Sequence, residues 1–206
     1  MFEMLHMVRQ GGWTMLPLGI CSVVALTIII ERAMALRRNR VIDPVTLRII
    51  EDYEGEASAP AALIACQRCA GAFAEILAEV IRNRRLDHAQ AVESLRAVGR
   101  TQVGRLERGL TVLEIVAGIS PLLGLLGTVL GLVQVFDAIT ARGLGDPQVL
   151  SAGISKALVT TVAGLMIAIP SLAFHSLFNK RVDELATEMQ DRATAFLVKL
   201  QQYQGQ

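Results

Sequence analysis

The stretch Ile115–Phe136 (IVAGISPLLGLLGTVLGLVQVF) is 22 residues long and contains no Asp, Glu, Lys or Arg. A second run of 22 residues, Ala157–Phe178 (ALVTTVAGLMIAIPSLAFHSLF), and a run of 19, Gly12–Ile30 (GWTMLPLGICSVVALTIII), share this property. A bilayer core about 30 Å thick needs about 20 helical residues at about 1.5 Å each. The three runs therefore predict an all-α membrane protein with three transmembrane helices.

Composition agrees with this interpretation and excludes other classes of protein. The chain of 206 residues is 52% hydrophobic and 19% charged, with a net charge of +1 and a mean hydropathy of +0.46. A nearly neutral chain is not expected to hold nucleic acid by neutralising phosphates. Three cysteines are too few for a disulfide-stapled secreted scaffold.

The basic residues predict the orientation of the helices, because Lys and Arg accumulate in cytoplasmic loops. Twelve arginines lie in residues 36–112, whereas residues 137–156 contain one arginine and one lysine. We therefore expect the N-terminus and the short second loop outside, and the long loop and the C-terminal tail in the cytoplasm. The first run is interpreted as an anchor and not a signal peptide, because it exceeds an h-region of about 7–15 residues and its arginine cluster follows it.

Helical spacing of apolar residues predicts that spans two and three extend into the cytoplasm as long helices. The stripe in the tail could pack inside one subunit or form an oligomer contact, and the spacing does not distinguish these alternatives. The stripe before span two is Val92, Leu95, Val103, Leu106, Leu110 and Leu113, and the stripe in the tail is Phe178, Val182, Leu185, Met189, Ala193, Phe196 and Leu200.

These observations divide the chain into seven predicted segments. They are an outer amphipathic segment (1–11), transmembrane helix 1 (12–35), a cytoplasmic helical loop (36–112), transmembrane helix 2 (113–136), an outer loop (137–153), transmembrane helix 3 (154–178) and a cytoplasmic helical tail (179–206).

Spans two and three carry small residues and hydroxyls on one helical face. Small residues allow helix backbones to approach closely in lipid, and threonines there could bond their own helix or form a polar contact surface. Pro121 frees a backbone carbonyl in mid-span. The predicted packing residues are Gly124, Gly127, Gly131, Gly164 and Ala168, and the threonines are Thr128, Thr160 and Thr161.

Charged groups are missing from the three runs, which bears on any proton movement. A channel that moved protons through its own carboxylates would place one there. We therefore expect a titrating carboxylate, if there is one, on a partner. His175 lies near the predicted cytoplasmic end of span three. The favoured interpretation is an interfacial polar residue, and the alternative is a proton relay.

Enzymatic, metal and cofactor motifs are not found in the sequence. Cys66-Gln-Arg-Cys69 is a single CxxC without the second pair of ligands that a structural zinc site requires. There is no phosphate-binding loop, nucleophile elbow or HExxH. We expect neither an enzyme nor a bound cofactor or metal.

The segments GISPLLGLLGTVLGLVQVF (118–136) and GISKALVTTVAGLMIAIPS (153–171) resemble the MotA/TolQ/ExbB proton channel family. GGWTMLPLGICSVVALTIIIERAMAL (11–36) is similar to the family's first span. Length and loop arrangement resemble ExbB or TolQ more than the four-span MotA type. The resemblance implies a homopentamer in the bacterial inner membrane, around a dimer of ExbD/TolR-type single-span partners. Force would pass to a TonB- or TolA-type protein.

The resemblance also implies roles for individual residues. The partner helix would carry a proton-bearing aspartate, and the threonines that face it correspond to Thr128 and Thr161. Thr160 stands where relatives often have alanine, and Pro121 belongs to the same motif. Lys156 departs from the glutamate that is typical of ExbB and TolQ, and a lysine cannot pass protons as a carboxylate does. The expected function is an ExbB-like motor subunit that energises TonB-dependent transport. A TolQ-like envelope-integrity subunit and a non-conducting membrane scaffold are the alternatives.

Overall fold

The computed structural model describes residues 13–142 and 147–204, and these form helices and no strand. The predicted amphipathic segment 1–11 lies outside the described residues. The elements are α2 (Met15–Ala35), α3 (Arg38–Val41), α4 (Pro44–Glu51), the 3-10 turn η1 (Glu56–Ser58), α5 (Ala59–Arg68), α6 (Ala72–Arg82), α7 (His88–Leu106), α8 (Leu110–Arg142) and α9 (Pro147–Gln204). The all-α prediction is confirmed.

In the described part of the chain, three helices are long and apolar enough to cross a membrane, as predicted. The qualifying stretches are Met15–Ala35, Leu110–Asp137 and Gly153–Tyr203. The 58 residues of α9 are far more than the roughly 20 that a bilayer requires, so this helix continues well beyond its span. α8 extends to Arg142 and α9 begins at Pro147, so helix covers part of the predicted loop 137–153.

The helix expected to run straight into span two is interrupted. α7 ends at Leu106 and α8 starts at Leu110. Between them Gly109 has φ +87°, in the left-handed region that side chains with a Cβ rarely adopt. The apolar spacing continues through this point, which is why periodicity alone did not reveal the break.

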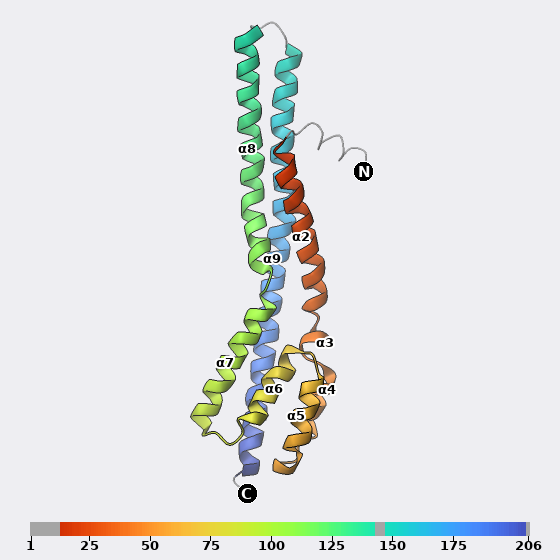
Figure 1. Ribbon diagram of the computed structural model, residues 1–206, viewed down its shortest axis with the longest axis vertical. Coiled ribbons are helices and arrows are strands. Elements are labelled where there is room, and N and C mark those ends of the chain that lie inside the picture. Colours follow the sequence, from red (N-terminus) through yellow and green to blue (C-terminus); the bar gives the residue numbers. More distant parts are fainter. Residues whose placement is uncertain (1–12, 143–146, 205–206) are drawn as a thin grey trace. The chain divides into compact units, whose positions relative to one another are not determined.

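The chain forms two compact units. Of the described residues, the first combines 13–30 with those of Gly109–Ser176, and the second combines Glu31–Arg108 with 177–204. In the first unit α2, α8 and the N-terminal half of α9 lie side by side (Figure 1). Their outward faces are strongly apolar, with Leu122 64% and Met166 68% exposed. Such continuous apolar surface suits hydrocarbon or neighbouring helices better than water.

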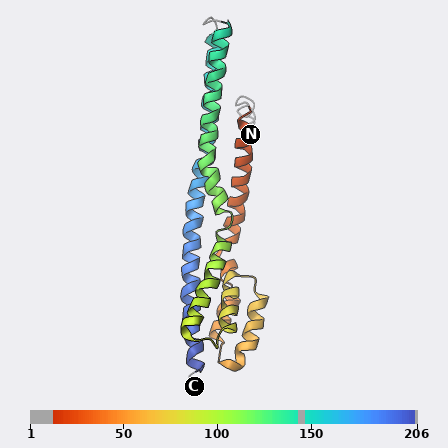
Figure 2. The same cartoon turned by 60° about the vertical axis from the view of Figure 1, so that its left-hand side comes forward.

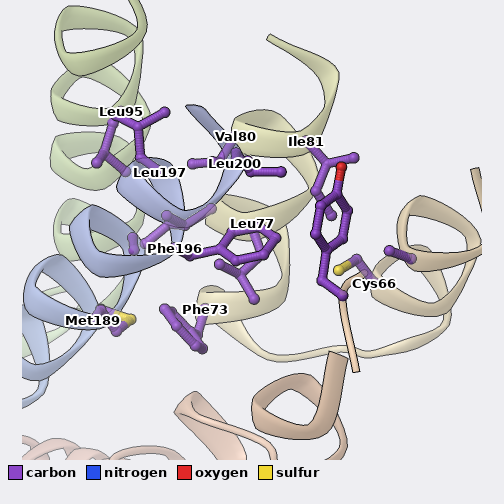
Figure 3. Close-up of a cluster of buried hydrophobic side chains, with 14 of the residues drawn as sticks. Cys66, Phe73, Leu77, Val80, Ile81, Leu95, Met189, Phe196, Leu197 and Leu200 are labelled. Carbon is purple, nitrogen blue, oxygen red and sulfur yellow. The ribbon is translucent and has the colours of Figure 1, made fainter. Parts of the chain in front are cut away.

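The second unit has a core of its own. α6 and α7 lie beside the C-terminal half of α9 (Figures 1 and 2), and α5 packs against α6. Apolar side chains of α6 and α9 interdigitate at the centre (Figure 3). The tail stripe from Leu185 to Leu200 is therefore packed inside one chain, which decides between the two alternatives for that part of the stripe. The core residues seen in Figure 3 include Phe73, Leu77, Val80, Ile81, Met189, Phe196, Leu197 and Leu200.

Polar contacts fix the connections of the second unit. Asp43 caps α4 by accepting a hydrogen bond of 2.8 Å from the Val45 backbone N–H. Lys199 Nζ of α9 donates to the Ile50 carbonyl at 2.8 Å, at the carboxyl end of α4. A cation at this end satisfies carbonyls that the helix leaves free.

Of the two CxxC cysteines, Cys66 belongs to this core and Cys69 is half-buried. Cys66 is buried, and burial, followed by the neighbouring Cys69, raises the pKa of its thiol to about 11. A raised pKa keeps the thiol protonated and unreactive at neutral pH. Among the described residues no group of three or more His, Cys, Asp or Glu side chains could hold a metal ion.

Candidate functional site

The predicted site residues lie along the seam where α8 packs on α9 in the first unit. Gly131 faces Ala157, Gly124 faces Thr161, and Ser120 faces Gly164, so the two helices run antiparallel. The seam is too tight for larger residues. A Cβ on Gly124 would lie 2.8 Å from the Thr160 carbonyl oxygen. The backbones therefore approach through the small residues, and Ala168 is also buried.

Three threonine hydroxyls meet at the centre of this seam. Thr128 Oγ1 of α8 hydrogen-bonds with Thr161 Oγ1 of α9, and it lies 2.9 Å from the Ala157 carbonyl oxygen. Thr160 Oγ1 donates to the same carbonyl at 2.7 Å. The Gly124 carbonyl oxygen lies 3.3 Å from the hydroxyls of Thr128, Thr160 and Thr161. The hydroxyls thus join the two helices and do not serve their own helix alone.

The hydrogen-bond geometry does not fix which threonine hydroxyl of the pair donates its proton and which accepts. Each threonine has one proton to donate and two lone pairs to accept with. Either Thr128 or Thr161 can be the donor in their shared bond. Both residues are half-buried, whereas Thr160 is fully buried. The pair is therefore the part of the cluster that a neighbouring helix could reach.

Thr14 joins this region, and sequence reasoning missed it. A Cβ on Gly127 would lie 2.6 Å from Thr160 Oγ1 and 2.9 Å from Thr14 Oγ1, so both hydroxyls converge on Gly127. Thr14 directly precedes α2, a place where a threonine is an ordinary helix-capping residue. Its position gives no sign of a contact with residues more than a hundred positions away.

The remaining predicted residues are Pro121 of α8 and Lys156 of α9. Pro121 is half-buried, lies about two turns before Thr128, and leaves the Ala117 carbonyl without its helical partner. Its neighbour Ser120 is fully buried and donates to the Val116 carbonyl at 2.7 Å. Lys156 immediately precedes Ala157 in α9, and its side chain lies outside the described part of the chain.

Sequence analysis also missed an acidic partner for His175. His175 Nε2 on α9 lies 4.0 Å from Glu114 Oε2 on α8, and the two side chains are 20% and 65% exposed. Glu114 sits at the edge of an uncharged run, where it looked like an ordinary span end. Only the antiparallel packing of α8 and α9 brings it beside a residue 61 positions later.

Comparisons with known proteins show the family to which the chain is similar. Residues 69–191 match the MotA/TolQ/ExbB proton channel family. The chain is 32% identical over 190 residues to the biopolymer transport protein exbB1 of Vibrio cholerae, an alignment that covers 88% of this chain and 82% of the relative. It is 33% identical over 178 residues to the putative biopolymer transport protein ExbB-like 3 of Synechocystis, with 82% and 81% covered.

Other relatives match over less of their length. The putative biopolymer transport protein ExbB-like 1 of Synechocystis is 32% identical, and this chain spans 65% of its length. The Tol-Pal system protein TolQ of Haemophilus influenzae is 33% identical over 84 residues, which is 41% of this chain and 37% of that protein. The family match covers more than half of the chain and includes the α8–α9 seam, and the chain belongs to the MotA/TolQ/ExbB proton channel family.

Proposed function

We propose that the protein is an ExbB-like subunit of a proton-motive-force-driven motor, and that Thr128 and Thr161 face the proton-carrying carboxylate of a partner helix. The observation that carries this proposal is the half-buried hydroxyl pair at the centre of two helices that contain no carboxylate in their apolar runs. A hydroxyl that both donates and accepts can stabilise either protonation state of a carboxylate beside it.

The seam supports this role by keeping the pair rigid. Gly124, Gly131 and Gly164 hold the helices in close contact, so the hydroxyls keep their positions while the partner's carboxylate gains and loses a proton. One elementary charge crossing the membrane releases about 2.3 kcal/mol per 100 mV. This free energy is sufficient for small rotational steps between subunits whose packing changes little.

The proposed assembly is a homopentamer in the bacterial inner membrane around a dimer of ExbD/TolR-type helices. The N-terminus and the α8–α9 connection would lie outside, and the second unit would lie in the cytoplasm. The apolar outward faces of α8 and α9 support neighbouring helices or lipid. Native mass spectrometry on protein extracted gently from its membrane tests this assembly. We expect five copies with two copies of a small single-span protein, and a dimer or trimer without companions would reject it.

Relatives favour an ExbB-like role over a TolQ-like one. The similarity to exbB1 extends over 88% of this chain, whereas the similarity to TolQ extends over 41%. We therefore propose that the motor energises TonB-dependent transport across the outer membrane, through a TonB-type protein.

Thr161→Val tests the proton role, because valine keeps the shape and removes the hydroxyl. The protein is reconstituted into vesicles with its copurified partner, and proton influx is measured with a pH-sensitive dye under an imposed potential. We expect Thr161→Val to abolish influx while the partner remains bound. Thr27→Val is the matched control, because the exposed Thr27 hydroxyl bonds only the Val23 carbonyl of its own helix in the described structure. Full influx in an assembled Thr161→Val complex would reject the proposed role of Thr161, and no influx in the unsubstituted complex would favour the non-conducting scaffold.

Lys156 is proposed to contact an acidic group of the partner. Its position one residue before Ala157, whose carbonyl receives two threonine hydroxyls, supports a place close to the proton path. Lys156→Glu is expected to weaken retention of the partner during copurification. An unchanged complex with unchanged influx would reject this role.

A further inference from the structure

Glu114 and His175 form the one acid–histidine pair within 4.0 Å in the described part of the first unit. The separation of Nε2 and Oε2 is too long for a direct hydrogen bond, and a single water or a closure of about 1 Å would connect the atoms. The Glu114 side chain is much more exposed than the His175 side chain. The imidazole is 20% exposed and the carboxylate is 65% exposed, so the pair leads from the interior of the seam toward the outer surface of this unit.

His175 continues the face of α9 that carries the threonine cluster. It lies one helical turn after Ser171, which is 1% exposed, and Ala168 and Gly164 precede Ser171 on the same face. The fourteen residues from Thr161 to His175 span about 21 Å of helix. The pair therefore stands at the end of the hydroxyl-bearing seam, on the side away from the α8–α9 connection.

The surrounding charges are few. The part of α2 described in this unit, residues 13–30, contains no ionisable group except Cys21, and the next acid on α8 is Asp137, at its other end. On α9 the nearest charged residues are Lys180 and Arg181, more than one turn beyond His175. Glu114 is thus the acid that faces the imidazole across the seam.

We propose that Glu114 and His175 are the proton-release pair of the channel, an inference that rests on the proposed function. A proton that has passed the threonine cluster binds the Nε2 lone pair of the neutral imidazole. The imidazolium then transfers this proton to the Glu114 carboxylate, directly or through one water, and the exposed carboxyl group releases it to bulk water. Histidine suits this position because an imidazole nitrogen accepts a proton through its lone pair and donates it again. Each step moves one proton, and both groups return to their starting state.

The test measures proton influx in the reconstituted complex for His175→Gln and Glu114→Gln. Glutamine keeps the size and hydrogen-bonding ability of each side chain and removes its titration. We expect each variant to lower influx about a hundredfold or more, because a positioned acid–base group typically supplies at least this factor. The double variant should conduct no less than the slower single variant, because the two groups act in one step. Glu114→Asp, which keeps the carboxylate, should retain most of the influx.

The controls separate this inference from the function on which it rests. Glu184→Gln removes an exposed carboxylate of α9 that pairs with Arg181, and it should leave influx unchanged. Unchanged influx in assembled His175→Gln or Glu114→Gln would overturn the release pair, and so would loss of the partner in both variants, which would indicate a purely structural contact. Either of these results rejects the release pair alone if the unsubstituted complex conducts protons and the Thr161→Val complex does not. No influx in the unsubstituted complex rejects both.

Discussion

Gly164 of α9 lies against the backbone of Ser120 in α8 so closely that a Cβ at position 164 would be 2.5 Å from the Ser120 carbonyl oxygen. This oxygen belongs to a helix backbone and cannot move aside as a flexible side chain can. Position 164 therefore sets the distance between the two helices that carry the threonine cluster, and glycine is the residue that permits it.

Gly164→Ala should destabilise the α8–α9 pair by about 1–3 kcal/mol, the usual cost of overpacking a tight contact. The measurement is thermal unfolding of the purified protein in one detergent. Gly118→Ala on α8 is the matched control, because a Cβ there meets nothing within 4 Å, and its effect should stay within about 0.5 kcal/mol. Equal effects of the two substitutions would show that the close approach at Gly164 does not limit stability.

Thr128 and Thr161 should be energetically coupled, because their hydroxyls bond each other across the seam. A double-mutant cycle with Thr128→Val and Thr161→Val should give a coupling free energy of about 0.6 kcal/mol, and up to about 1.7 kcal/mol, as for other interhelical hydrogen bonds in membranes. The comparison cycle pairs Thr161→Val with Thr27→Val, whose effects should add within about 0.5 kcal/mol. Additivity in both cycles would contradict the bond.

Glu56 should make the second unit sensitive to acid. Its carboxylate accepts hydrogen bonds of 2.8 Å from Arg84 and 3.0 Å from Arg85, which lower its pKa from 4.5 to about 2. A depressed pKa means that the ion pair stabilises the folded state above about pH 4.5, and that this contribution is lost as the pH falls toward about 2. Glu56→Gln should therefore lower the unfolding temperature at neutral pH and reduce its further decline in this window.

Glu54→Gln is the control for this titration, because no ion pair of Glu54 is present in the described structure. The difference between Glu56→Gln and the unsubstituted protein should shrink at high salt, since the pair is exposed and salt screens it. A pH profile of Glu56→Gln that parallels the unsubstituted protein over the whole window would rule out this contribution.

Phe196→Ala should destabilise the second unit by about 3–5 kcal/mol, because a fully buried aromatic ring leaves a large cavity. The ring packs edge-on against Tyr53, with centroids 5.3 Å apart and planes at 88°. The measurement is hydrogen exchange of the backbone amides of α6, a helix whose side chains belong to this core. Lower stability of the second unit should appear as faster exchange of these amides. Val198→Ala on the same helix removes a side chain that is 44% exposed and should change exchange little. Protected α6 amides in Phe196→Ala would show that the core does not depend on this ring.

Local sequence features were sufficient for the spans and for much of the packing pattern. An uncharged run of about 20 residues is decisive wherever the rest of the chain lies, because the bilayer imposes length and polarity on each segment separately. The small-residue face of α8 could likewise be read from residues three and four positions apart. The break at Gly109 could not be predicted in this way, because the apolar spacing continues through it. A glycine is compatible with both a helix and a left-handed turn.

The sequence by itself determined the three apolar spans, the absence of acidic residues inside them, the faces that carry glycine and threonine, and the family. The tertiary structure alone decided which groups meet. It joined Thr128 to Thr161, brought Thr14 to Gly127, set Glu114 beside His175 and placed most of the tail stripe in a core within one chain. The physical reason is that run length and helical periodicity act over neighbouring residues. Contacts between residues 33, 61 or more than a hundred positions apart depend on how whole helices pack.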